Sequence, residues 1–322
     1  TAWRSTSSTS ALGVTSSQQW HPTKDLVLST TDAMGLRSTR VYDALDRPIE
    51  TYAAAPAGCF TSDRRPVRDA SVAFACGVTP AKSSTVYDEG FRGLQVAYYS
   101  KTRKLSGKPE AYSLGVGGAD GAFEKDWGGG SPVPGVVSSD EFSLRATGLI
   151  EFPQAGSYQL RTMSDDGTRV WLDDVLLIDR WVDQGPTPAD SYVFEARAGE
   201  VRRLRIEYYE NLGGARVDLQ WKTPGAGTFQ VVPGAQLRPD YGLVTRSTVE
   251  DSTRVLGASA PSMVSEKTYS DPIVGQVSAV TVEGVLMSPA TSSLPPIFTS
   301  LVISTSASIF APFGAVTRAV RS

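Results

Sequence analysis

Histidine and cysteine are nearly absent from this 322-residue sequence, which contains one histidine and two cysteines. The single histidine, His21, excludes zinc sites built from several histidines, and any catalytic arrangement that needs an imidazole would have to use it. Acidic and basic side chains number 34 and 31, giving a formal net charge of -3. This balance lacks the basic surface typical of nucleic-acid binding. Among the side chains that could catalyse a reaction or bind a metal, carboxylates are therefore the abundant ones.

Long apolar runs are scarce as well. The stretch Ile297–Val316 is fairly apolar, but several serines and threonines and Pro312 interrupt it. We therefore expect no membrane insertion. The sequence starts at Thr1 without an initiator methionine or a signal segment, which indicates a piece of a longer chain.

The two cysteines, Cys59 and Cys76, lie 17 residues apart and belong to no CxxC motif or Cys/His cluster. A local disulfide is favoured over two free thiols. Closing such a loop would stabilise the fold by roughly 3 kcal/mol, and it would require an oxidising compartment. We therefore expect a secreted or cell-surface protein.

No stretch shows a sustained helical period. Apolar and polar residues alternate instead, as in Val217-x-Leu219-x-Trp221, and this pattern is typical of half-buried strands. Residues 90–241 predict one all-β domain, a β-sandwich or a partly closed barrel. Its expected strands are Leu94–Ser100, Phe142–Ile150, Ser157–Met163, Thr168–Leu172, Val175–Arg180, Val201–Tyr209, Arg216–Lys222 and Thr228–Val232.

The segment before this domain divides into three parts. Residues 1–25 are rich in serine and threonine and are expected to be a flexible, low-complexity lead-in. In residues 26–55, strand-like runs at Leu26–Thr31 and Arg37–Tyr42 are joined by a short Asp/Gly turn. Residues 56–89 form a linker that carries the cysteine pair.

Two motifs in residues 26–55 carry a family resemblance. Thr31-Asp32-x-x-Gly35, followed by Tyr42-Asp43-x-x-x-Arg47-Pro48-Ile49, resembles one unit of the YD repeat of Rhs proteins. Asp46 stands where that family usually has glycine, a place that an Asp tolerant of left-handed backbone can fill. The resemblance implies β-hairpin segments of the long strand spirals that enclose a shell, often around a C-terminal toxin.

A fainter copy of this motif, Tyr269–Gly275, lies in residues 242–288, a degenerate YD-repeat segment. Two copies cannot close a shell, so the implied partners are other YD-repeat segments of the same parent chain. Residues 289–322 match neither pattern, and this Ser/Thr-rich tail is expected to be disordered.

Residues 90–241 carry further motifs in a fixed order. They are Gly93-Leu94, Tyr98-Tyr99, Trp127-Gly128-x-Gly130-x-Pro132, Phe142-Ser143-x-Arg145-x-x-Gly148, Pro153-x-x-Gly156-x-Tyr158, Ser164-Asp165-Asp166-Gly167-x-Arg169-Val170-Trp171-Leu172-Asp173-Asp174, Ile178-Asp179-x-Trp181, Ile206-Glu207-Tyr208-Tyr209-Glu210 and Gly214-Ala215-x-Val217-x-Leu219-x-Trp221. This series is similar to the protective-antigen-type (PA-fourteen) lectin-like domain. The resemblance implies a β-sandwich, inserted here between two YD-type segments.

Two aspartate pairs stand out. Asp173–Asp174 separates two apolar strands and is predicted to be a hairpin turn. Asp165–Asp166 follows a predicted strand and precedes Gly167, so it is either a type I turn or a calcium site. Neighbouring side chains of an extended strand point to opposite faces, so both carboxylates reach one ion only if the backbone is distorted, as by a cis peptide.

The family resemblance favours calcium at this position. Sugar-binding relatives hold calcium with such a pair, with an asparagine and backbone carbonyls from a later loop, and sugar hydroxyls complete the ion's shell. Carried over, the metal ligands are Asp165, Asp166 and Asn211, with the carbonyls of Leu212 and Gly213 as weaker candidates. Residues expected at the sugar are these three side chains together with Glu210 and Trp181. For any single tryptophan here, Trp181 included, packing in the core or a hairpin is favoured over sugar binding.

Three functions remain open from the sequence. The first is a non-catalytic, calcium-dependent carbohydrate-binding or adhesion module of an extracellular YD-repeat protein, with a glycan or cell-surface polysaccharide as partner. The second is a structural or protein-interaction domain of an Rhs-type toxin-delivery shell. The third is a glycosidase or a glycosidase-associated domain, although no local pattern identifies the two carboxylates that this chemistry requires.

Overall fold

The computed structural model describes residues 4–67, 76, 80–101, 103–251, 262–285 and 298–303. In this part of the chain the regular structure is almost entirely β, and all strand pairings are antiparallel. Three one-turn helices interrupt it: η1 (Ala57–Cys59), η2 (Ala119–Gly121) and η3 (Gly234–Gln236). Among the residues described, no helix is both long enough and apolar enough to cross a membrane.

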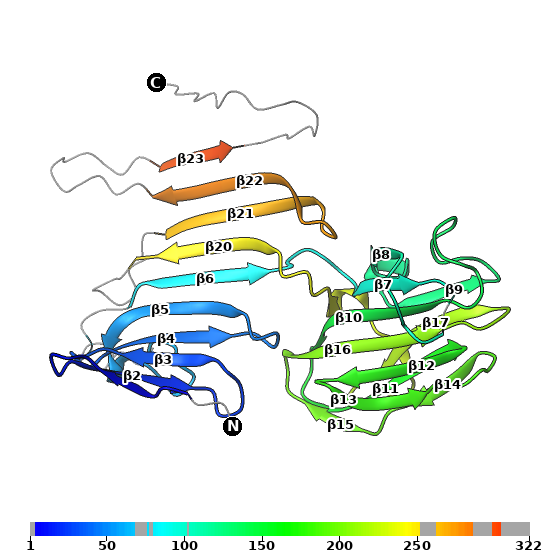
Figure 1. The fold of residues 1–322 in the computed structure, drawn as a ribbon, viewed down its shortest axis with the longest axis horizontal. Helices are drawn as coiled ribbons and strands as arrows, with labels where there is room; N and C mark the ends of the chain where they lie inside the picture. The colour runs from blue at the N-terminus through cyan, green and yellow to red at the C-terminus, as the bar shows by residue number, and fades with distance from the viewer. Residues whose placement is uncertain are drawn as a thin grey trace.

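Ten strands form one antiparallel sheet, which we call the flanking sheet (Figure 1). They follow one another in chain order across it, except that β6 pairs with β20. The strands are β1 (Ser7–Thr9), β2 (Thr15–Trp20), β3 (Val27–Thr31), β4 (Leu36–Tyr42), β5 (Pro48–Pro56), β6 (Lys82–Tyr87), β20 (Val244–Glu250), β21 (Ser262–Asp271), β22 (Gln276–Val285) and β23 (Phe298–Ile303).

The turns of this sheet follow from aspartates in the repeat-like motifs. The Asp32 carboxylate accepts the backbone N–H groups of Met34 and Leu36, both at 2.9 Å. Asp43 does the same for Leu45 and Arg47, at 2.9 and 3.0 Å. An aspartate that satisfies the backbone two and four residues ahead closes a tight turn and sets the return of the next strand.

The expectation of a flexible lead-in over residues 1–25 is wrong for the described part of that segment. β1 and β2 form a hairpin there, and β2 continues onto β3. Threonine suits a pleated strand, and the indole N–H of Trp20 donates to the Ser5 carbonyl at 2.9 Å. Composition alone does not predict this hairpin, because β2 gains its order from pairing with β1 and β3.

A small core closes one end of the flanking sheet. Val41, Tyr52 and Phe60 pack together there, and the structure joins Cys59 to Cys76 in a disulfide with the two Cα atoms 5.6 Å apart. Residues 56–89 were expected to be a linker, but besides the disulfide they contribute β6 to the sheet. Of the expected tail, residues 298–303 form β23 on the edge of the sheet, and the rest lies outside the described residues.

The other part of the molecule is a β-sandwich between β6 and β20 (Figure 1). One sheet has the order β13-β12-β16-β10-β7-β8 with β19 on β10, and the other has β14-β11-β17-β18 with β15 on β11 and β9 on β17. The strands are β7 (Gln95–Tyr99), β8 (Ala111–Leu114), β9 (Glu124–Gly128), β10 (Ser143–Phe152), β11 (Gly156–Asp165), β12 (Gly167–Leu172), β13 (Val175–Arg180), β14 (Thr187–Asp190), β15 (Phe194–Ala196), β16 (Glu200–Tyr209), β17 (Ala215–Lys222), β18 (Gln230–Val231) and β19 (Leu237–Arg238).

Alternation along the strands builds the core of the sandwich. Ile150 and Ile206 of one sheet and Leu160 and Leu219 of the other are fully buried in a single cluster. The eight strands expected from alternation are present, with Thr228–Val232 reduced to β18. The short strands β8, β9, β14, β15 and β19 were not expected, because runs of two to five residues are too short to show a period.

One buried carboxylate joins the two parts of the molecule. Asp88, which is 1% exposed, follows β6 and accepts the N–H groups of Gly242 and Leu243 at 3.0 and 2.9 Å, just before β20. Arg47, in the turn between β4 and β5, pairs with it at 2.9 Å. The first and last residues of the sandwich are thus held together by one side chain.

We expect Asp88→Ala to destabilise the protein by about 3 kcal/mol, because it removes a buried charge partner of Arg47 and two backbone hydrogen bonds together. Urea unfolding followed by circular dichroism measures this. Asp25→Ala is the matched control, since the Asp25 side chain is 76% exposed where it pairs with Arg4, and its loss should change the free energy of unfolding by less than about 0.5 kcal/mol. Equal effects of the two substitutions would contradict the role assigned to Asp88.

Candidate metal centre

Three carboxylates meet where strands of the two sheets of the sandwich end. β11 ends at Asp165, Asp166 connects it to β12, and Glu210 directly follows β16. The peptide between Asp165 and Asp166 is cis. One carboxylate oxygen from each of Asp165, Asp166 and Glu210 lies within 4.8 Å of the other two. The chain thus brings three acidic oxygens to a single point.

Backbone N–H groups hold Asp166 in place. Its two carboxylate oxygens accept the N–H of Gln184 at 2.7 Å and the N–H of Asn211 at 2.8 Å. Gln184 lies in the β13–β14 loop and Asn211 in the β16–β17 loop, so Asp166 fixes both loops beside the cluster. Asp165 is anchored through its main chain, because its carbonyl accepts the Tyr208 hydroxyl.

Glu210 is the most deeply placed member of the cluster. Its side chain is 0% exposed, and neither carboxylate oxygen has a hydrogen-bond partner among the described residues. Burial, followed by the nearby charges of Asp166, Asp165 and Asp140, raises the pKa of Glu210 to about 8. Burial and the charges of Asp166 and Asp126 also raise the pKa of Asp165. The cluster is therefore an uncompensated concentration of negative charge.

Such a cluster fits a hard divalent cation. Calcium takes carboxylate and carbonyl oxygens as ligands and tolerates irregular geometry, and a cation would remove the repulsion that raises these pKa values. Zinc would call for nitrogen or sulfur ligands, which this cluster does not offer. The donor set therefore favours calcium.

Asn211 lies beside the cluster, but its side chain has another partner. Its side-chain amide N–H donates to Asp183 at 3.1 Å, and its backbone carbonyl accepts the Glu141 N–H at 2.8 Å. A ligand role for the Asn211 side chain stays a prediction, as do the carbonyl ligands at Leu212 and Gly213. Leu212 is 69% exposed at the tip of the loop.

An aromatic and charged rim adjoins the cluster. The ring of Trp181 packs on Tyr209 with centroids 4.6 Å apart, and the guanidinium of Arg169 lies 4.7 Å from the Trp181 ring centroid. The Tyr209 hydroxyl donates to Asp183 at 2.7 Å, and Arg103 pairs with the same carboxylate at 2.8 Å. Trp181 therefore packs against its neighbours while part of its side chain stays exposed.

The second aspartate pair and the single histidine lie away from the cluster. Asp173 and Asp174 form the β12–β13 hairpin turn, both with positive φ, at 49° and 66°. The ring of His21 accepts the backbone N–H groups of Thr23 and Lys24 at 3.3 and 3.2 Å, which makes it a turn residue. Neither of these features contributes to the acidic cluster.

The sequence alone does not mark Glu210 as a metal ligand, although the family resemblance places this residue at the sugar. Its neighbours in β16 follow strand alternation, and nothing in the sequence marks the residue after a strand as buried. Gln184 and Asp183 were missed because their roles depend on a loop that folds back onto Asp166. Of these three residues, only Glu210 could have been found from the sequence, because it directly precedes the candidate ligand Asn211.

Comparison with known proteins finds relatives of the sandwich. Residues 90–235 match the family model of the PA14 domain. The anti-sigma-I factor RsgI3 of Acetivibrio thermocellus is 33% identical over 123 residues, 38% of this chain and 19% of that protein. The chain therefore spans about a fifth of the length of this curated relative.

Solved structures with a similar fold include an anti-sigma factor domain-containing protein, 23% identical with a TM-score of 0.42, covering 55% of this chain and 68% of that one. A PA14 sugar-binding domain from an RTX adhesin is 16% identical with a TM-score of 0.38, covering 47% of this chain and 100% of that one.

The raised pKa of Glu210 predicts how the metal-free protein responds to pH. The folded pKa of about 8 lies above the ordinary value of 4.5, so the folded state binds this proton more tightly than the unfolded state does. The free energy of unfolding should therefore decrease as pH rises from about 5 to 8. Urea unfolding in EDTA at both pH values measures this.

Glu210→Gln should flatten that decrease, because the amide does not titrate. Glu266→Gln is the control, since Glu266 pairs with Arg246 at the surface of the flanking sheet. A wild-type slope retained in Glu210→Gln would show that Glu210 does not carry the effect.

Proposed function

We propose that the PA14 domain of this chain is a non-catalytic, calcium-dependent carbohydrate-binding module. Asp165, Asp166 and Glu210 bind the ion, and Asn211 with the loop carbonyls of Leu212 and Gly213 completes the protein's share of ligands. Hydroxyl groups of a glycan take the remaining positions. The observation that carries this proposal is the convergence of three carboxylates that form no ion pair with any basic residue the structure describes.

The charges around the acidic cluster favour a bound cation. None of the ion pairs among the described residues includes Asp165, Asp166 or Glu210, whereas nearby Asp183 pairs with Arg103. Leaving buried carboxylates unpaired is costly, and the same arrangement becomes favourable once a cation is bound. The cluster is thus built for a ligand that the polypeptide does not itself supply.

The position of the cluster supports a glycan as the second ligand. Loops β11–β12, β13–β14 and β16–β17 meet there, and Trp181 on the second of these is partly exposed. A sugar that reaches the ion through its hydroxyls would find an aromatic edge and polar groups beside it, the mixed surface that carbohydrate recognition needs. The resemblance of the sequence to sugar-binding domains points to the same ligand class.

The disulfide and the flanking sheet indicate the setting. Cys59–Cys76 favours an oxidising compartment, so we place the protein outside the cell or at its surface. A second candidate function is a structural or interaction domain on an Rhs-type shell. The order of successive hairpins, with YD-like motifs at the β3–β4, β4–β5 and β21–β22 turns, favours it, and it is compatible with glycan binding by the sandwich.

Calcium binding is tested by isothermal titration of the 322-residue chain after EDTA treatment. We expect one site, and we expect Asp165→Asn to weaken it at least about 100-fold, or ~2.7 kcal/mol, because a charged ligand is lost while the backbone anchors of Asp166 remain. Asp173→Asn, in the exposed hairpin turn, is the matched control and should bind as wild type does. An unchanged affinity in Asp165→Asn would refute the site.

Glycan binding is tested on an array of neutral glycans with calcium, with EDTA and with the Asp165→Asn variant. We expect hits that disappear in EDTA and in the variant together, since the ion forms part of the sugar site. Hits that persist in EDTA would contradict the calcium-dependent mechanism. Calcium binding without any glycan hit would leave the ion with a structural role and favour the second candidate function.

A further inference from the structure

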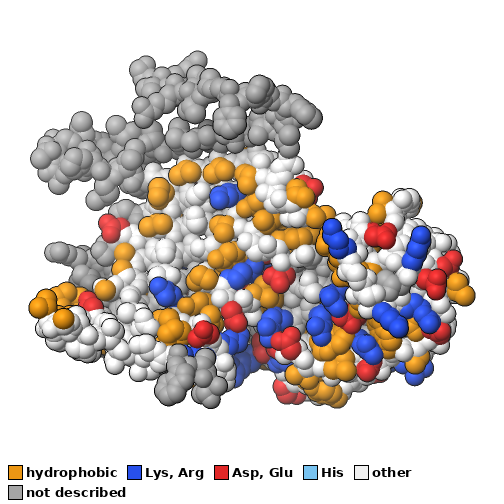
Figure 2. Space-filling view, viewed as in Figure 1, with side chains coloured by type: hydrophobic (Ala, Val, Ile, Leu, Met, Phe, Trp, Pro, Cys, Tyr) orange, Lys and Arg blue, Asp and Glu red, His pale blue; other side chains and the backbone are white. Residues whose placement is uncertain are grey.

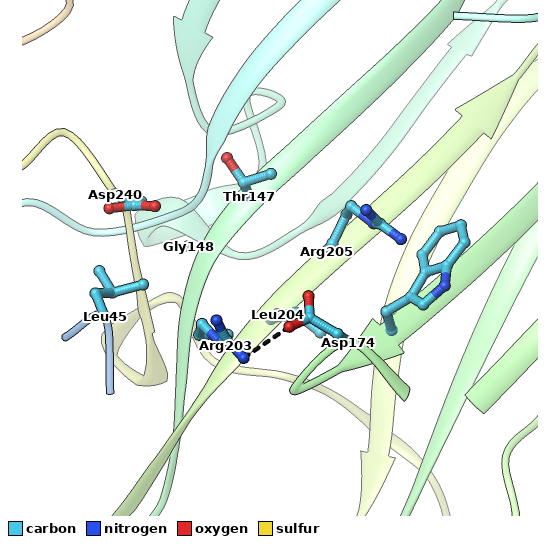
Figure 3. A pocket seen from close by; sticks show the side chains of 9 residues that line it. Leu45, Thr147, Gly148, Asp174, Arg203, Leu204, Arg205 and Asp240 are labelled. Carbon is cyan, nitrogen blue, oxygen red and sulfur yellow. Dashed lines mark hydrogen bonds and ion pairs between the residues drawn. The ribbon is translucent and has the colours of Figure 1, made fainter. Parts of the chain in front are cut away.

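A groove of about 210 Å³ lies where the flanking sheet meets the sandwich, away from the acidic cluster. Leu45, from the β4–β5 turn, forms one side together with Asp240, and Arg205 lies across the groove from them (Figure 3). Thr147, Gly148 and the Arg203–Asp174 ion pair, at 2.7 Å, lie between these sides. The two parts of the molecule thus build one concave surface.

The outer face of the sandwich sheet is organised in rows across β10, β16 and β12. Arg145, Glu207 and Arg169 are opposite one another in the pairing of these strands. In this row positive and negative charges alternate, because Arg145 pairs with Glu207 at 2.9 Å and Arg169 pairs with Asp179 at 2.8 Å. Such cross-strand pairing satisfies each charge within the sheet.

The next row breaks this pattern. It consists of Thr147, Arg205 and Trp171, and it has no carboxylate. The Arg205 guanidinium lies 3.9 Å from the Trp171 ring centroid, and no described residue forms an ion pair with it. Its Nε is buried without a hydrogen-bond partner among the described residues. Stacking on the indole fixes the plane of the guanidinium and leaves its terminal Nη groups free to donate.

We propose that this groove binds a hexuronate residue of an acidic glycan, with the sugar carboxylate on Arg205. A planar guanidinium with an unpaired edge is suited to a carboxylate, which it can bind through two parallel hydrogen bonds. The Thr147 hydroxyl and the Asp240 carboxylate are available for sugar hydroxyls, and Leu45 presents an apolar surface to the sugar ring. The volume suits one monosaccharide rather than a longer segment.

Figure 2 shows that charged side chains of both signs gather on the sandwich, whereas the flanking sheet presents mostly uncharged side chains in this view. The groove is also separate from the metal centre. Arg205 precedes Glu210 by five residues on extended β16, a separation of about 16 Å. Hexuronate binding in the groove therefore needs no calcium.

The experiment is a titration of the full chain, in EDTA and at low salt, with D-glucuronate, D-glucose and propionate, followed by ligand-detected NMR. We expect glucuronate to bind with a millimolar dissociation constant. Glucose should bind at least tenfold more weakly, and propionate should also bind more weakly than glucuronate. Equal binding of glucose would overturn the role of the carboxylate. Equal binding of propionate would overturn the assignment to a sugar, and no binding of glucuronate would overturn the site.

Variants of the same chain test whether Arg205 is the residue that binds the sugar carboxylate. Arg205→Gln should weaken glucuronate binding at least tenfold, and Arg205→Lys should weaken it less, because charge is kept while the planar edge is lost. Arg145→Gln, one row away on the same face, is the matched control and should bind as wild type does. If Arg205→Gln and Arg205→Lys both bind as wild type does, the proposal is wrong. Because calcium is absent throughout, these results do not depend on the metal centre.

Discussion

The carboxylate of Asp88 is the constraint on which the arrangement of this molecule depends. It accepts hydrogen bonds from Gly242 and Leu243, so the sandwich leaves and rejoins the flanking sheet at one point and β6 can pair with β20. Through Arg47 it also fixes the β4–β5 turn. That turn carries Leu45, one wall of the groove at the seam. A single buried charge thus sets both the continuity of the sheet and the shape of the second proposed site.

Asp88 and Glu210 show two outcomes for a buried carboxylate. Asp88 is surrounded by a guanidinium and backbone N–H groups, which supply its charge and hydrogen-bond requirements. Glu210 is buried to the same degree, but its nearest charged neighbours are Asp166 and Asp165, and its pKa rises accordingly. The first arrangement is complete within the polypeptide, and the second becomes complete only with a cation. Burial alone does not separate a structural carboxylate from a functional one, whereas the sign of its surroundings does.

Much of the sandwich was predictable from sequence, because alternation and the PA14-like motifs are local signals. The Asp165–Asp166 pair was also identifiable, since two adjacent carboxylates before a glycine are conspicuous. Glu210 was not identifiable as a metal ligand, because its contact with that pair depends on how β16 lies between β10 and β12. The hairpin in residues 1–25 and the unpaired Arg205 could not be predicted from the sequence, for a related reason. Each is defined by a neighbour across the sheet, and a single sequence does not show which strands are neighbours.

Strand β16 connects the two sites by geometry. Leu204, Ile206 and Tyr208 face the core, so Arg205 must face outward into the groove, and Glu210 must follow at the end where β11 meets β12. A slip of one residue would bury Arg205 and expose Ile206, which the packed core does not allow. The hydrophobic pattern that holds the sandwich together therefore also fixes where both sets of charged groups stand. The acidic site at one end of the strand and the basic site nearer its middle are consequences of one register.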